Sequence, residues 1–268
     1  FADALAERGV EVLYLERLLA EALEDPAVRE GVLLQTLRAG NLKPELGPAA
    51  HAWLEGLTSA EAAHWLIGGV AWDELPFETE SLAALVARTG DGGFALPPLP
   101  NHMFTRDTSA WIYDGVSVNA MAKPARTREA IHLDAIYRHH PLFLGREFER
   151  WSDGWPLPPH LEGGDVLVIG NGAVLVGMGE RTTPVAVELL AERLFDAGAA
   201  REVIAVSLPA RRSAMHLDTV LTMIDRDAFT IYPDLRAALV PYVLRSGRNG
   251  LDAATGTGSP RDREASHA

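Results

Sequence analysis

Three aspartates of the chain each stand directly before an apolar strand pattern. They are Asp107, Asp165 and Asp218. Glu162 precedes the second of them across Gly163-Gly164, a pair that permits close approach of the backbone. His216 stands two residues before the third, so in an extended strand both side chains lie on one face. Because carboxylates gathered in one place repel one another and raise some of their pKa values, the pattern predicts a cation among them.

Two kinds of cation suit these side chains. A metal ion would serve a metal-dependent hydrolase, and its ligands would be His216, Asp218, Glu162 and Asp165. The set contains one obvious histidine, however, and none of the paired-histidine spacings of a metal-binding helix. A guanidinium group fits better, because its planar fork of five donors makes bidentate contacts with several carboxylates.

Two arginines follow the hairpin patterns, each at the start of a helical pattern. Arg126 stands directly before the helical pattern TREAIHLDAIYRHH. One residue separates Arg181 from the helical pattern TPVAVELLAERLF. The helix dipole disfavours a cation at this end, which favours a functional role over an ordinary surface ion pair. We interpret the two arginines as a clamp for an anionic group at the opposite end of the site. Free arginine is the simplest molecule that has both a carboxylate and a cationic tail.

The elements that must position these residues form a repeat. Residues 107–122 and 165–178 read as β-hairpins around Asp114-Gly115 and Asn171-Gly172, residue pairs that a type I′ turn prefers. A third hairpin opens at Asp218. The pattern strand, strand, helix, strand recurs about every 55 residues, which is typical of blades around an axis. Equivalent strand ends would then bring the three aspartates to one central mouth.

The rest of the chain divides by its periodicity. Residues 1–25 read as helix, the strand VEVLYL from Val10, and a second helix, which we interpret as a partial first propeller unit. Residues 26–95 show a helical pattern, with a capping box at Thr58 and Glu61, and are predicted to be an inserted helical subdomain. Residues 96–245 hold the propeller units. Residues 246–268 have almost no large apolar side chain and are predicted to be a disordered tail.

Composition excludes several function classes. The 268 residues carry 24 basic and 37 acidic side chains, a net charge of −13, which argues against nucleic acid and anionic membranes as partners. No run approaches the roughly 18 apolar residues of a membrane span, so we expect a soluble, cytoplasmic protein. The chain has no cysteine, so it offers no thiolate nucleophile. It begins at Phe1 in what reads as the middle of an element, and we expect it to be a fragment.

Three stretches together resemble bacterial arginine deiminase. They are PNHMFTRDTSAWIYDGV (100–116), HLEGGDVLVIGNGAVLVGMGERTT (160–183) and SAMHLDTVLTMID (213–225). The resemblance implies an α/β fold, here an incomplete five-bladed α/β propeller of ββαβ units with the helical insertion. It also implies hydrolysis of L-arginine to L-citrulline and ammonia without a metal or organic cofactor. A homo-oligomer is possible.

The resemblance also implies a role for each site residue. Asp107 and Asp218 would bind the guanidinium nitrogens, while Glu162 would hold the guanidinium and handle protons. His216 would be the general acid and base, a task that suits histidine near neutral pH. The remaining residues would bind the amino-acid end of the substrate or shape the pocket. Those expected on the α-carboxylate are Arg126 and Arg181, and those around the pocket are Asn101, Phe104 and Asp165.

One departure from the family affects activity. The nucleophile of the family is a cysteine near the C-terminus, with a further substrate-binding arginine just before it, and this chain has no cysteine. Two alternatives therefore stay open. The chain is either a piece of an arginine deiminase that is inactive by itself, or a non-catalytic remnant that at most binds arginine.

Overall fold

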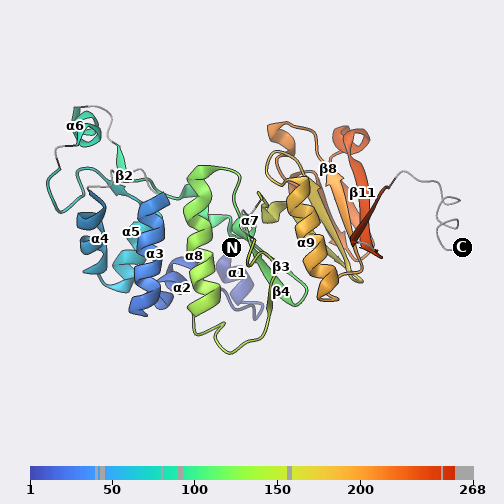
Figure 1. Ribbon diagram of the computed structural model, residues 1–268, viewed down its shortest axis with the longest axis horizontal. Coiled ribbons are helices and arrows are strands. Elements are labelled where there is room, and N and C mark those ends of the chain that lie inside the picture. Colours follow the sequence, from blue (N-terminus) through green and yellow to red (C-terminus); the bar gives the residue numbers. More distant parts are fainter. Residues whose placement is uncertain are drawn as a thin grey trace, which may run out of the picture. The chain divides into compact units, whose positions relative to one another are not determined.

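The computed structural model describes residues 1–39, 42, 46–79, 81–89, 93–155, 159–248 and 250–256. It is a mixed α/β structure that divides into two compact units (Figure 1). Unit 1 comprises Phe1–Met103 and Ala125–Arg146, and unit 2 comprises Phe104–Pro124 and Glu147–Ala268. The boundaries of the two units are set by the contacts between residues within each unit. The sequence-based segments 1–25, 26–95 and 96–245 stay a prediction.

Unit 1 is mainly helical. Its helices are α1 (Ala2–Ala6), α2 (Leu15–Ala22), α3 (Pro26–Ala39), α4 (Gly47–Glu55), α5 (Ser59–Gly68), α6 (Leu82–Thr89) and α8 (Thr127–His139). A small antiparallel pair, β1 (Val70–Ala71) and β2 (Phe94–Leu96), joins them. The core is a cluster of aliphatic side chains from α2, α3, α4, α5 and α8, among them Leu19, Leu33, Leu54, Leu66 and Ile136. The predicted capping box forms: the Thr58 hydroxyl accepts from the Glu61 amide at 3.3 Å, and the Glu61 carboxylate accepts from the Thr58 amide at 2.9 Å.

The strand expected from Val10 does not form. Residues 10–14, which the structure describes, take no regular secondary structure, and helix α2 begins at Leu15. The prediction of a strand from the alternation of VEVLYL was wrong, because a strand also needs a hydrogen-bonded neighbour, and none of the described strands pairs with these residues.

In the residues that the structure describes, unit 2 contains three sheets and one long helix. The strands of the three-stranded sheet are β3 (Ser109–Ile112), β4 (Gly115–Val118) and β5 (Glu149–Arg150), in that order. The five-stranded sheet has the order β12 (Gly250–Thr255), β11 (Val240–Gly247), β8 (Glu202–Ser207), β7 (Ala173–Met178), β6 (Val166–Gly170). A separate pair consists of β9 (Leu221–Asp225) and β10 (Ala228–Ile231). Helix α9 (Pro184–Asp196) lies against the five-stranded sheet (Figure 1) and supplies Leu190 and Leu194 to their shared core.

All three predicted hairpins are present, with one change in a turn. In the second hairpin, Asn171 and Gly172 have the positive φ angles that a type I′ turn requires. In the first, Ile112 pairs with Gly115, so the turn residues are Tyr113 and Asp114 and the positive φ falls on Tyr113. The turn therefore lies one residue earlier than the Asp-Gly pair suggested.

The third repeat departs from the ββαβ pattern. After β10 the chain forms a 3₁₀ turn (Pro233–Ala238), and β11 then pairs antiparallel with β8 of the five-stranded sheet. Within the described residues the sheets do not close into a ring, and the five-bladed propeller stays a proposal. Part of the predicted disordered tail is ordered: β12 pairs with β11 from Gly250 to Thr255 through backbone hydrogen bonds, which need few large side chains. Residues 249 and 257–268 lie outside the described residues.

A short helical turn precedes each hairpin. These turns are α7 (Thr105–Thr108) before β3, η4 (Gly163–Asp165) before β6, and η6 (Leu217–Thr219) before β9. The turn η4 contacts both α7 and η6. Residues that are far apart in the sequence, at the entrances of three hairpins, therefore lie together in unit 2.

Two buried histidines of unit 1 make its stability depend on pH. His102 Nε2 lies 2.9 Å from His132 Nδ1, and each side chain is almost inaccessible to solvent. Burial, followed by the charges of Arg126 and Arg128, lowers the pKa of His102 to about 4, and burial also holds the pKa of His132 well below its usual value.

We therefore expect unit 1 to lose stability as the pH falls below 6.5. Between 6.5 and about 4 the unfolded His102 binds a proton that the folded residue does not. This difference lowers the free energy of unfolding by about 3 kcal/mol. Urea unfolding at a neutral and an acidic pH measures the loss, which should be smaller in His102→Gln and unchanged in His64→Gln, a substitution of an exposed histidine. Equal pH dependence in all three proteins would contradict the assignment.

Candidate functional site

Five of the predicted site residues come together in unit 2. Asp107 lies on α7, Glu162 and Asp165 at η4, and His216 and Asp218 at η6. The glycines between Glu162 and Asp165 allow the approach. A Cβ atom on Gly163 would overlap the carbonyl oxygen of Arg106, and one on Gly164 would lie 2.7 Å from His216 Nδ1. The predicted convergence of hairpin entrances is thus present in the structure.

His216 lies between two carboxylates. Its Nε2 is 2.7 Å from Glu162 Oε2, and its Nδ1 is 3.7 Å from Asp107 Oδ1. Burial alone would lower the pKa of His216, but the hydrogen bond with Glu162 and the charges of Asp165 and Asp107 raise it above the usual value. A histidine whose pKa is raised by neighbouring carboxylates holds its proton more firmly, and such a group can serve as a general acid.

Glu162 is the most heavily engaged carboxylate of the site. It is fully buried and accepts hydrogen bonds from the Ala122 amide at 3.1 Å and from Arg181 Nη1 at 3.3 and 3.2 Å, in addition to its contact with His216. Burial opposes its charged form. The hydrogen bond from His216 and the charge of Arg181 nevertheless hold the pKa of Glu162 below its usual value. Glu162 is therefore a carboxylate that stays ionised in a buried position.

Arg181, which the sequence suggested for a clamp at the anionic end, lies beside the acidic cluster, and its role on the α-carboxylate stays a prediction. Its guanidinium contacts Glu162 directly, and its Nη2 lies 3.9 Å from the sulfur of Met215. Among the described residues its buried Nε has no acceptor. Spacing along the chain could not reveal this contact, because the long side chain of arginine can reach either end of a site of this size.

Asp165 is fully buried, and protein donors occupy both of its carboxylate oxygens. Its Oδ1 accepts from the Leu217 amide at 2.9 Å, and its Oδ2 accepts from the Thr182 hydroxyl at 2.6 Å. The same hydroxyl accepts from the Glu162 amide at 3.1 Å. Burial raises the pKa of Asp165 to about 7, although the hydrogen bond from Thr182 acts against the rise. Asp165 and Thr182 thus tie together the segments that carry Glu162 and His216.

Thr182 is a site residue that sequence reasoning missed. It is fully buried between Glu162 and Asp165. A threonine next to Arg181 carries no signal of its own, and only the two hydrogen bonds reveal its position.

Asp218 forms the more exposed side of the cluster. Burial raises its pKa, and the charge of Asp107 adds to the rise while that of His216 opposes it. These mutual effects place Asp107, His216 and Asp218 within one electrostatic group. Phe104 is the N-cap residue of α7, the turn that contains Asp107, and the Asp107 amide donates to the Phe104 carbonyl oxygen at 3.1 Å. The ring of Phe104 is exposed.

Asn101 and Arg126 belong to unit 1 and are described there by themselves. Arg126 is buried, and its Nε and Nη2 donate to the carboxylate of Glu129 at 2.8–3.1 Å. Its Nη2 also lies 3.3 Å from the Asn101 carbonyl oxygen. The sequence missed Glu129 as the partner of Arg126. The role of both predicted residues in substrate binding stays a prediction.

The metal alternative has a partial basis in this geometry. Ligand atoms of Asp107, Glu162 and His216 lie within 4.8 Å of one another, whereas the predicted set named Asp165 and Asp218 beside Glu162 and His216. Asp165 has both oxygens occupied by protein donors. Arg181 already supplies a positive charge to Glu162, and it would repel a metal ion bound there. A guanidinium on Glu162 would meet the same repulsion, so it is the occupied oxygens of Asp165 that disfavour the predicted set of metal ligands.

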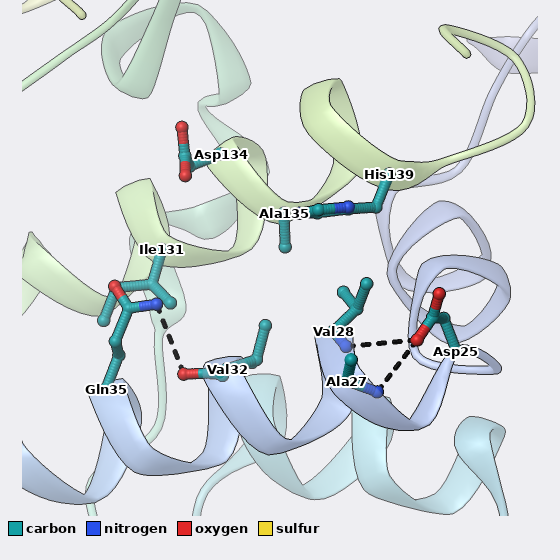
Figure 2. A pocket seen from close by; sticks show the side chains of 10 residues that line it. Asp25, Ala27, Val28, Val32, Gln35, Ile131, Asp134, Ala135 and His139 are labelled. Carbon is teal, nitrogen blue, oxygen red and sulfur yellow. Dashed lines mark hydrogen bonds between the residues drawn. The ribbon is translucent and has the colours of Figure 1, made fainter.

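A separate cavity lies in unit 1. It has a volume of about 200 Å³ between α3 and α8 and is lined by Asp25, Val28, Gln35, Asp134 and His139, among others (Figure 2). Two backbone amides at the start of α3, those of Ala27 and Val28, donate to Asp25 there. None of the carboxylates of the unit 2 cluster lines this cavity.

Comparison with known families decides the relationship. The family model described as arginine deiminase matches residues 1–262 of the 268. The chain belongs to the arginine deiminase family. The resemblance inferred from the three sequence motifs is confirmed, and the five residues of the cluster lie within the segment that matches the arginine deiminase family.

Solved structures similar to this arginine deiminase family member include two of dimethylarginine dimethylaminohydrolase. One is an adduct with 4-chloro-2-hydroxymethylpyridine, with 19% identity over 51% of each chain and a TM-score of 0.38. The other, from Pseudomonas aeruginosa, is a cysteine-to-serine variant complexed with citrulline, with 18% identity over 63% of this chain and 68% of that one and a TM-score of 0.40. The chain thus spans about half the length of the first. Among the described residues, no helix is both long and apolar enough to cross a membrane.

Proposed function

We propose that the unit 2 cluster binds the guanidinium of L-arginine and belongs to an arginine deiminase, which hydrolyses L-arginine to L-citrulline and ammonia. The observation that carries this proposal is the buried, ionised Glu162 next to a histidine of raised pKa, with Asp107 and Asp218 beside them. A guanidinium needs acceptors in one plane, and carboxylates that fix this plane expose its carbon to attack.

Each side chain then has a task in the reaction. Asp107 and Asp218 accept from the guanidinium nitrogens, and Glu162 keeps the group charged. Protonated His216 can give its proton to the departing ammonia and afterwards take one from the attacking water. Asp165 and Thr182 position Glu162 and the segment of His216 without touching the substrate.

The nucleophile expected from the family is not among these residues. The 268 residues contain no cysteine, and covalent attack on the guanidinium carbon needs a thiolate or an equally activated group. We therefore propose that the chain binds L-arginine and does not turn it over by itself.

Calorimetric titration with L-arginine tests the binding proposal. We expect Asp218→Asn to weaken binding at least about tenfold, because a charge-assisted contact is lost. Asp225→Asn, which changes an exposed aspartate at the end of β9, is the matched control and should bind as the wild type does. Equal affinity of the Asp218 and Asp225 variants would refute the site. Formation of citrulline by the purified chain, retained after removal of contaminating enzymes, would refute the second proposal.

A further inference from the structure

The cation that neutralises Glu162 comes from the chain itself. Arg181 Nη1 lies 3.3 and 3.2 Å from the two oxygens of Glu162, and the Arg181 side chain is 16% exposed. The guanidinium of Arg181 and the guanidinium of a free arginine are the same chemical group. Both pair with carboxylates, and only one of them can lie against Glu162 in this manner.

The acceptor capacity of Glu162 is nearly used up in this arrangement. A carboxylate offers about four lone-pair positions. Three donors already point to Glu162: the Ala122 amide, His216 Nε2 and Arg181 Nη1, the last of which reaches both oxygens. Two guanidinium groups on the same carboxylate would also repel each other. A ligand guanidinium must therefore take the place of Arg181.

Apart from the contact with Glu162, only weak interactions hold the Arg181 side chain in this position. Within the described part of the chain, its Nη2 meets the Met215 sulfur, a poor acceptor, and its Nε has no acceptor. Its backbone lies between β7 and α9, beyond the last residue of the strand. Rotation of the side chain away from Glu162 thus breaks few hydrogen bonds.

We infer that Arg181 is an internal occupant of the guanidinium subsite on Glu162, and that an incoming guanidinium binds by displacing it. With L-arginine as that ligand, the inference rests on the proposed function. The displaced side chain carries its charge with it and is then available to the carboxylate of the same ligand. Arg181 would accordingly compete with one end of the substrate and attract the other.

Binding of the free guanidinium ion to variants tests this inference. Arg181→Ala and Arg181→Met remove the internal occupant and leave Glu162 in place. We expect both to bind guanidinium at least about tenfold more tightly than the wild type, because the buried carboxylate has lost its arginine partner. The ion is titrated as its chloride up to about 20 mM, where its linear effect on protein stability is negligible, against equal sodium chloride. Binding is followed by the NMR signals of His216, which contacts Glu162.

The matched control is Arg245→Ala. Arg245 pairs with Glu202 at 2.7 Å, but its side chain is exposed, so its removal should create no guanidinium site. The double variant Glu162→Gln, Arg181→Ala should lose the binding that Arg181→Ala gains. If both Arg181 variants fail to fold, the wild type still gives an answer, because binding of L-arginine should shift the NMR signals of the Arg181 guanidinium.

The outcomes separate this inference from the proposed function. If L-arginine binds the wild type through Asp218 and the Arg181 variants gain no affinity for guanidinium, the inference is wrong and the function stands. If L-arginine binds none of the proteins and Arg181→Ala still gains a guanidinium site that needs Glu162, the function is wrong and the inference stands. Unchanged Arg181 signals in a wild type saturated with L-arginine would also overturn the inference.

Discussion

Replacement of Glu162 by glutamine is expected to remove measurable L-arginine binding and to lower the free energy of unfolding of unit 2 by about 3 kcal/mol. Glutamine has nearly the same shape, so the change removes the charge and leaves Arg181 and His216 buried beside an amide. The amide presents one oxygen where the carboxylate presents two. A loss of at least about a hundredfold in affinity for L-arginine follows.

The His216 titration shows whether this effect arises from the lost charge. The hydrogen bond with Glu162 is the largest contribution that raises the pKa of His216, so the pKa should fall in the variant. Below the usual pKa of histidine, the ion pair stabilises the wild type, and this stabilisation is lost as the pH rises through the raised pKa. The control is Glu180→Gln, which changes an exposed glutamate that pairs with Lys123. A pKa of His216 that is equal in both variants would contradict the prediction.

The second large effect is expected at Gly163. Alanine there would put a methyl group onto the carbonyl oxygen of Arg106, a backbone atom that cannot rotate away. The turns α7 and η4 would have to separate, and with them Asp107 and Glu162. We expect a destabilisation of about 3 kcal/mol, measured by urea unfolding, together with loss of L-arginine binding.

Gly179→Ala serves as the control for this substitution. Gly179 lies in the turn that leads to Arg181, and a Cβ atom there would meet Leu208 at an ordinary contact distance of 3.5 Å. Its unfolding midpoint and its affinity should remain near those of the wild type. If Gly163→Ala behaves in the same way as Gly179→Ala, the close packing of the two turns is not essential to the site.

The sequence predicted the acidic cluster because its members occupy equivalent places in a repeat. Asp107, Asp165 and Asp218 stand at the entrances of three hairpins, as predicted, and Glu162 and His216, which precede two of them, lie close to Asp107. The contact between Arg181 and Glu162 was not predictable in this way. Repeats fix where a backbone segment lies, whereas the choice among partners within reach of a long side chain depends on rotamers and on competing charges.

The fold was predictable where local signals and long-range pairing agree. The hairpin at Asn171-Gly172 has alternation, turn residues and a neighbouring parallel strand, and it forms as expected. The segment from Val10 has the alternation without a partner, and no strand forms. Residues 250–255 have little alternation of apolar side chains but pair with β11, and a strand forms there. Pairing partners are a tertiary property that composition does not reveal.

The two sides of the site rest on supports of different stiffness. Glu162 and Asp165 lead into β6, an edge strand of the five-stranded sheet on which a helix packs, whereas Asp218 leads into the two-stranded β9–β10 ribbon, whose Ile224 is 69% exposed. An isolated ribbon of two strands is marginal in water and opens often. Ligands that rely on Asp218 would therefore have to order this ribbon as they bind, an entropic cost that ligands held by Glu162 do not meet.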